Sequence, residues 1–144
     1  VSHPQRSASL EVPALAQNPE LPTGCESVAL TNALLSLGVN LGKTVIADNW
    51  LPLSEDDFVT AFMGDPHSTD GHSCMEPPGA AYRTARENGR TYRLYANSHC
   101  VVVSGYDLNE GLVLVSDSLA GQVSYDLQQF AVRYYELGAQ AVVI

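Results

Sequence analysis

The chain has 144 residues, of which 45% are apolar and 16% charged, a composition typical of one globular domain with a single core. Seven Lys and Arg against sixteen Asp and Glu give a formal net charge of −9, which argues against nucleic acid or an anionic membrane as the partner. No apolar run approaches the roughly 20 residues of a membrane-spanning helix. We therefore expect a single domain over residues 1–144 with no membrane-spanning segment.

The N-terminal half is predicted to be mainly helical. We expect residues 1–10 to form a loose arm and residues 17–22 a loop constrained by two prolines. An apolar run that ends at Gly38 predicts a central helix over residues 24–37. Further helical segments are then expected on either side of a long polar loop at 64–79: residues 43–50, 54–63 and 80–88.

The C-terminal half is richer in β-branched and aromatic residues, which predicts strands. We expect these strands, joined by a hairpin turn at 107–111, at residues 91–95, 99–106, 112–116 and 122–125. A helix over 127–137, ended by Gly138, and a closing strand over 140–144 complete the pattern. Helices followed by antiparallel strands predict an α+β fold.

Cys25 is the strongest candidate for a reactive side chain. Thr23 and Glu26 have the spacing of a capping box, which places Cys25 in the first turn of the predicted helix. The partial positive charge and unpaired N–H groups of a helix start favour the thiolate, so we expect a lowered thiol pKa. The neighbouring negative charge of Glu26 opposes this effect, unless the Glu26 side chain is bonded to the Thr23 backbone N–H in the capping box. The alternative is that Cys25 is a small buried apolar residue, as most cysteines are.

A cysteine nucleophile needs an imidazole base, and the imidazole needs a group that orients it. His99 and Asp117 lie at similar distances on either side of a turn centred near Asn109, so a hairpin would bring both to its open end. We expect a hydrogen bond between them. Gln17, in the loop before Cys25, could donate to an oxyanion together with the Cys25 backbone N–H. The alternative for His99 is a structural histidine bonded to a turn aspartate. The alternative for Gln17 is an ordinary polar loop residue.

Two specific stretches resemble the C39-like cysteine peptidases of bacteria, which have a papain-like fold: QNPELPTGCES at 17–27 and HCVVVSGYD at 99–107. Two weaker ones are GDP at 64–66 and SD at 116–117. The resemblance implies a Cys25 nucleophile, a His99 base, an Asp117 orienting group and a Gln17 oxyanion donor, acting on a peptide or protein through an acyl-enzyme. It also implies a secreted or surface-associated protein, and a first residue other than Met agrees with the removal of a leader.

The chain departs from the family pattern in two places. The family usually has an Asp-Pro pair at the third catalytic position, whereas this chain has Asp117 followed by Ser118. Relatives also carry a longer segment before the histidine strand, so a helix and a strand are expected to be missing around residues 89–98. The same residues could serve an acyltransferase or transpeptidase, and a binding module that has lost catalysis is a further alternative.

No cofactor and no metal ion is predicted. The long loop does hold several potential ligands, but their spacing matches no standard zinc site, and we interpret them as polar loop residues: Asp65, His67, Asp70, His72 and Cys74. Three cysteines are too few for a disulfide scaffold. One pair, such as Cys74 with Cys100, would leave Cys25 free and indicate an oxidising compartment. The sequence leaves that pairing and the oligomeric state open.

Overall fold

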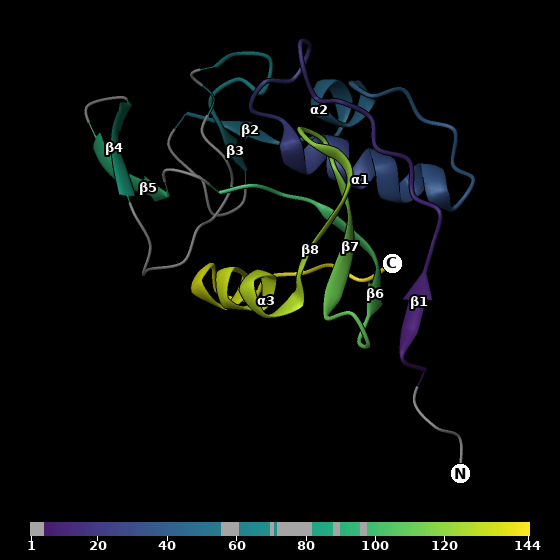
Figure 1. Ribbon diagram of the computed structural model, residues 1–144. Helices are drawn as coiled ribbons and strands as arrows, with labels where there is room; N and C mark the ends of the chain where they lie inside the picture. The colour runs from purple at the N-terminus through teal and green to yellow at the C-terminus, as the bar shows by residue number, and fades with distance from the viewer. Residues whose placement is uncertain (1–4, 56–60, 70, 72–81, 88–89, 96–97) are drawn as a thin grey trace.

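A four-stranded antiparallel sheet occupies the C-terminal half of the chain and takes its edge strand from the N-terminus (Figure 1). The computed structural model describes residues 5–55, 61–69, 71, 82–87, 90–95 and 98–144. In spatial order the strands of the sheet are β1 (Ser7–Ser9), β6 (Val102–Asp107), β7 (Leu112–Asp117) and β8 (Gly121–Asp126). The turn between β6 and β7 contains Gly111 at φ 69°, a conformation that glycine adopts at little cost.

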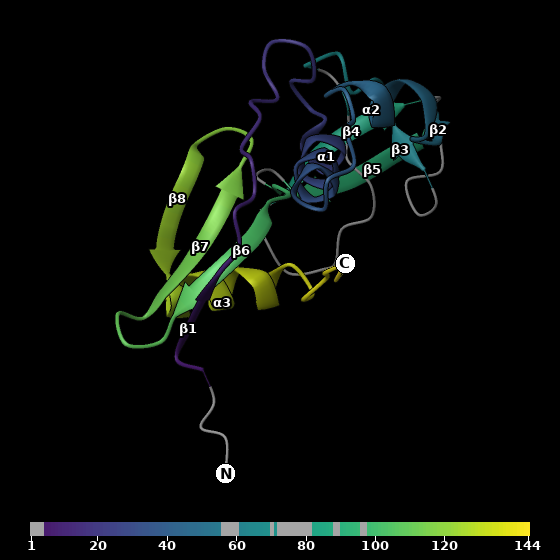
Figure 2. The same cartoon turned by 90° about the vertical axis from the view of Figure 1, so that its right-hand side faces the viewer.

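Three helices accompany this sheet: α1 (Cys25–Ser36), α2 (Val45–Asn49) and α3 (Leu127–Glu136). Helix α1 contacts β6 and β7, whereas α3 follows β8 and contacts β7 and β8. Figure 1 shows α1 and α2 at one end of the sheet and α3 at the other, and the turned view in Figure 2 places the α1–α2 half beside the sheet. None of the described helices has the length and apolar composition needed to cross a bilayer.

Two small sheets lie outside the main one. Strands β2 (Leu53–Ser54) and β3 (Phe62–Met63) pair in parallel, and β4 (Tyr82–Glu87) and β5 (Arg90–Tyr95) form an antiparallel pair. The β4–β5 pair stands to one side of the molecule in Figure 1.

The buried residues of α1 explain why this helix is central. Seven of its residues are buried, including Val28, which packs with Leu21 and Ala47 in one apolar cluster. Val113 and Val115 are buried on β7, two residues apart and therefore on one face of the strand. The predicted central helix is confirmed, and both predicted glycine ends are present, with Gly38 and Gly138 at φ 83° after α1 and α3.

Three strands of the main sheet, β6, β7 and β8, and the α+β class are also as expected, but four local predictions are wrong. Within the predicted loose arm, Ser7–Ser9 forms β1 and pairs with β6. The predicted helix at 80–88 contains strand β4, because pairing with β5 outweighs local propensity. Met63 and Phe62 form β3 rather than a helix end, and residues 56–60 lie outside the described part of the chain. Residues 140–144 are exposed and form no strand.

The pairing of β1 with β6 gives a test of this edge of the sheet. Gly105 lies opposite Ser9, and a Cβ atom there would overlap the Ala8 carbonyl oxygen and come 2.8 Å from the Ser9 Cα. Both obstacles are backbone atoms, so the strands must separate to admit a methyl group. We expect Gly105→Ala to lower the free energy of unfolding by about 1–3 kcal/mol, measured by urea denaturation.

Gly42→Ala is the matched control, because a Cβ at Gly42 meets only a Val45 methyl group at 3.4 Å. If both variants unfold at the same urea concentration, β1 does not contribute to stability through its contact with Gly105.

Candidate active site

His99 and Asp117 are joined by a hydrogen bond at the open end of the β6–β7 hairpin. His99 Nε2 lies 2.9 Å from Asp117 Oδ1, although β6 begins only at Val102 and its register shifts by one residue between Val103 and Gly105. The predicted bond is therefore confirmed, with the histidine reaching back from the segment that precedes the strand. The Asp117 residue is 5% exposed, whereas the His99 side chain is 25% exposed and open to a reactant.

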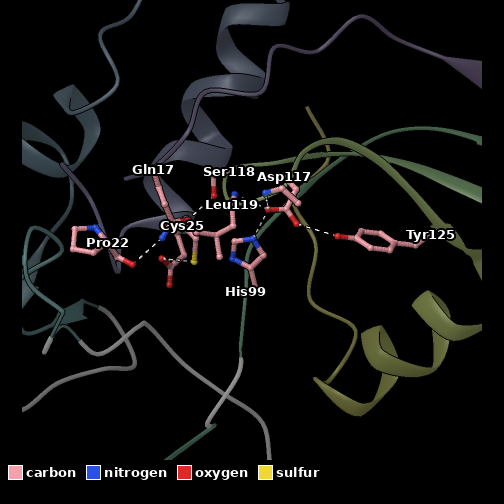
Figure 3. Close-up of polar contacts among 10 residues, drawn as sticks. Gln17, Pro22, Cys25, His99, Asp117, Ser118, Leu119 and Tyr125 are labelled. Atoms are coloured by element: carbon pink, nitrogen blue, oxygen red, sulfur yellow. Dashed lines mark hydrogen bonds and ion pairs between the residues drawn. The ribbon is translucent and has the colours of Figure 1, made fainter. Parts of the chain in front are cut away.

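The Asp117 carboxylate is fixed by the turn between β7 and β8. Its Oδ1 atom also accepts hydrogen bonds from the backbone N–H groups of Leu119 (2.7 Å) and Ala120 (3.1 Å), as an aspartate at the first position of a turn does. The Tyr125 hydroxyl donates to the other oxygen, Oδ2, at 3.3 Å (Figure 3). Burial alone would raise the pKa of Asp117, but the hydrogen bonds from His99, Leu119 and Ala120 hold it below its usual value.

Cys25 is the first residue of α1, as predicted, but the predicted capping box is wrong. Gly24 occupies the N-cap position and, having no side chain, places no cap over the N–H groups of the first turn. The Thr23 hydroxyl donates instead to backbone carbonyls of the 65–68 loop, including Ser68 at 2.9 Å. Thr23 thus joins the loop before Cys25 to a segment more than forty residues further along the chain.

The Cys25 thiol is buried and neutral, which overturns the expectation of a lowered pKa. Burial raises its pKa far above the usual range, and the charge of Glu26 raises it further. The Sγ–H group donates to Glu26 Oε2 at 3.3 Å, so the Glu26 charge faces the sulfur rather than the helix cap. A backbone hydrogen bond from Cys100 acts in the opposite direction.

The contact with Cys100 also places His99, the predicted base, near Cys25. Because Cys100 follows His99 directly and its backbone bonds to the Cys25 sulfur, the segment that carries His99 runs past the thiol. Figure 3 shows one ring nitrogen of His99 turned toward Asp117 and the other toward Cys25. The three residues predicted as nucleophile, base and orienting group therefore lie together.

Gln17 connects the loop that leads to Cys25 with the turn that follows Asp117. Its Nε2 donates to the Pro22 carbonyl at 2.8 Å, and its Oε1 accepts from the Ser118 hydroxyl at 2.6 Å. Pro22 lies in the loop that leads to Cys25, and Ser118 follows Asp117. The sequence drew attention to Gln17, but it marked Ser118 only as a departure from the family's Asp-Pro pair and gave no sign of Tyr125 as a site residue.

The described residues contain no cluster of three or more potential metal ligands. Of the loop residues considered above, His67 bonds through Nε2 to Asp48 and through Nδ1 to the Glu20 carbonyl, each at 2.9 Å. Asp70, His72 and Cys74 lie outside the described residues. Neither Cys25 nor Cys100 forms a disulfide in this structure.

The chain resembles known proteins both in sequence and in fold. A family model described as the Peptidase_C39 like family matches residues 9–93 and 80–142. The crystal structure of a proposed C39-like peptidase from Bacillus anthracis matches with a TM-score of 0.76 and 20% sequence identity, over 94% of this chain and 96% of that one. Among curated proteins, none matches this chain. The structural match spans nearly the full length of both chains, so it gives no support to a missing helix and strand before His99.

One prediction from this site concerns the effect of Glu26 on the pKa of the Cys25 thiol. Replacing Glu26 with Gln removes a negative charge beside the sulfur, which makes the thiolate less unfavourable and lowers the Cys25 pKa. We expect the rate of Cys25 alkylation by iodoacetamide, measured against pH by mass spectrometry, to rise at lower pH in Glu26→Gln than in the wild type.

Glu110→Gln is the control for net charge, since Glu110 lies in the β6–β7 turn at the far end of the hairpin. An unchanged pH profile in Glu26→Gln would show that Glu26 does not act on the sulfur.

Another prediction concerns the ionisation of Asp117. Its pKa is lower in the folded than in the unfolded chain, so the ionised form stabilises the fold. This contribution is complete above the unfolded-state pKa of about 3.9 and is lost as the pH falls through the folded-state value. In Asp117→Asn this contribution is absent. We therefore expect the wild type to lose its stability advantage over the variant between about pH 5 and pH 2 in urea titrations.

Asp107→Asn is the matched control, because Asp107 accepts two turn N–H groups in the same way, from Asn109 and Glu110, at the other hairpin turn. A stability difference between wild type and Asp117→Asn that stayed constant with pH would mean that the Asp117 charge does not stabilise the fold.

Proposed function

The chain belongs to the Peptidase_C39 like family, and we propose that it is a cysteine peptidase that cleaves a peptide or other acyl bond. The observation that carries this proposal is the bond from His99 Nε2 to the buried Asp117 carboxylate, in a segment that passes the Cys25 sulfur. A helix that begins at the proposed nucleophile and contacts an antiparallel sheet next to the proposed base supports a papain-like arrangement.

The first step follows from the state of the His99 ring. Asp117 is ionised and can only accept hydrogen bonds, so His99 Nε2 carries the proton in their bond. In the neutral form of the ring, the lone pair is then on Nδ1, on the side of Cys25. Because the resting thiol is neutral, Nδ1 takes its proton as the sulfur attacks the substrate carbonyl carbon. Asp117 stabilises the imidazolium that results.

Attack produces a tetrahedral intermediate whose oxygen carries the negative charge. The Cys25 backbone N–H, at a helix start with no side chain at the N-cap, and the second N–H of the Gln17 amide are the proposed donors to this oxygen. The leaving amine then takes the proton from His99 Nδ1, and an acyl-enzyme remains on Cys25. Water, deprotonated by the same nitrogen, releases the acid; an amine in its place would give a transfer product.

One observation favours a second candidate, a binding module without catalysis. The Cys25 residue is 9% exposed, and its thiol is neutral and bonded to Glu26, as expected of a structural cysteine. The two candidates differ in acyl transfer. A peptidase forms an acyl-enzyme and releases one equivalent of p-nitrophenol rapidly from p-nitrophenyl acetate, whereas a binding module shows no Cys25-dependent burst.

A test of the proposed nucleophile and the proposed base uses two substitutions. We expect Cys25→Ala to abolish both the p-nitrophenol burst and covalent labelling by an epoxide of the E-64 class, followed by mass spectrometry. His99→Ala should slow the burst by about 10²–10⁴-fold, because the base that removes the thiol proton is lost.

Cys100→Ala is the control for the second described thiol, and it should retain labelling at Cys25. Undiminished labelling in Cys25→Ala would show that another residue is the nucleophile, and the proposed function would then be wrong.

A further inference from the structure

Ser118 makes two hydrogen bonds to Gln17, one through the backbone and one through the side chain. Its carbonyl accepts from the Gln17 backbone N–H at 3.0 Å, and its hydroxyl donates to Gln17 Oε1 at 2.6 Å. Both residues are 3% exposed, so water does not compete for these bonds. The turn that fixes Asp117 is therefore also the turn that holds Gln17.

These bonds determine how the Gln17 amide is presented. A glutamine amide has two N–H donors and one carbonyl acceptor. Ser118 occupies the acceptor, and the Pro22 carbonyl takes one N–H at 2.8 Å. Pro22 is three residues before Cys25, so the Gln17 amide lies between the loop that leads to Cys25 and the turn that follows Asp117. Because Ser118 holds the amide oxygen, the amide nitrogen lies on the side of the loop that leads to Cys25. Its second N–H group can then donate to a further acceptor.

We propose that Ser118 is a positioning residue that holds the Gln17 amide as an oxyanion donor. The inference rests on the proposed function, because it assigns Ser118 a part in the same acylation step. Ser118 does not touch the substrate in this scheme. It restrains the amide so that little rearrangement is needed when the negative charge develops.

The test compares two reactions of the same sulfur. Acylation by p-nitrophenyl acetate passes through a tetrahedral oxyanion, whereas alkylation by iodoacetamide displaces iodide and forms no oxyanion. We expect Ser118→Ala to slow the p-nitrophenol burst by roughly 10-fold and to leave the rate of Cys25 alkylation unchanged. A substitution that merely disturbed the fold around Cys25 and His99 would slow both reactions together.

Two further variants make the test specific. Gln17→Ala should slow acylation by about 10²-fold, and adding Ser118→Ala to it should cause no further loss, because Ser118 acts only through Gln17. Ser118→Thr retains the hydroxyl and should restore acylation toward the wild-type rate. If Ser118→Ala does not fold, judged by circular dichroism, Ser118→Gly removes the same hydroxyl from the turn.

The outcomes separate this inference from the proposed function. A wild-type protein with no Cys25-dependent burst would overturn the proposed function and the role of Ser118 with it. A normal wild-type burst that Ser118→Ala leaves unchanged, slows together with alkylation, or slows additively with Gln17→Ala would overturn the positioning role alone.

Discussion

The arrangement of the site depends on one oxygen atom, Asp117 Oδ1. It accepts hydrogen bonds from two backbone N–H groups of its own turn and from the ring of His99. The hydrogen bonds within the turn hold the Asp117 carboxylate independently of His99, and burial strengthens each of these interactions. Asp117 joins β7, the β7–β8 turn and the segment that leads into β6, so the position of His99 follows from the hairpin that carries both residues.

Opposing influences act on the thiol of Cys25, the proposed nucleophile. Burial and the Glu26 charge keep the Cys25 thiol protonated, whereas the Cys100 backbone N–H favours the thiolate. A neutral resting thiol is a poor nucleophile, and it is also protected from unspecific alkylation and oxidation. In a peptidase with this balance, the proton leaves the sulfur only when His99 receives it. Reactivity is then tied to the bound substrate.

The loop before Cys25 is held by groups from distant parts of the chain. Thr23 donates to the 65–68 loop, and Gln17 is held by Ser118, one residue beyond Asp117. These contacts set the approach of the chain to α1, whose N-cap is a glycine that contributes no side-chain cap. The loop that leads to Cys25 and the turn that follows Asp117 are therefore joined by hydrogen bonds through Gln17.

By itself, the sequence determined the elements that local patterns specify. The glycines that end α1 and α3, the β-branched strands around the hairpin, the position of Cys25 at a helix start and the pairing of His99 with Asp117 could all be predicted from periodicity, turn residues and spacing. The family resemblance added the roles of these residues, which geometry alone does not establish.

Only the tertiary structure decided which partner each polar group meets. Thr23 and Glu26 have the spacing of a capping box, yet Thr23 bonds to a distant loop and Glu26 faces the sulfur. Residues 7–9 and 82–87 became strands because neighbouring strands offered hydrogen bonds that no local pattern reveals. The thiol pKa rises because the packed chain excludes water from Cys25, and solvent exclusion is a property of the assembled fold rather than of any short stretch of residues.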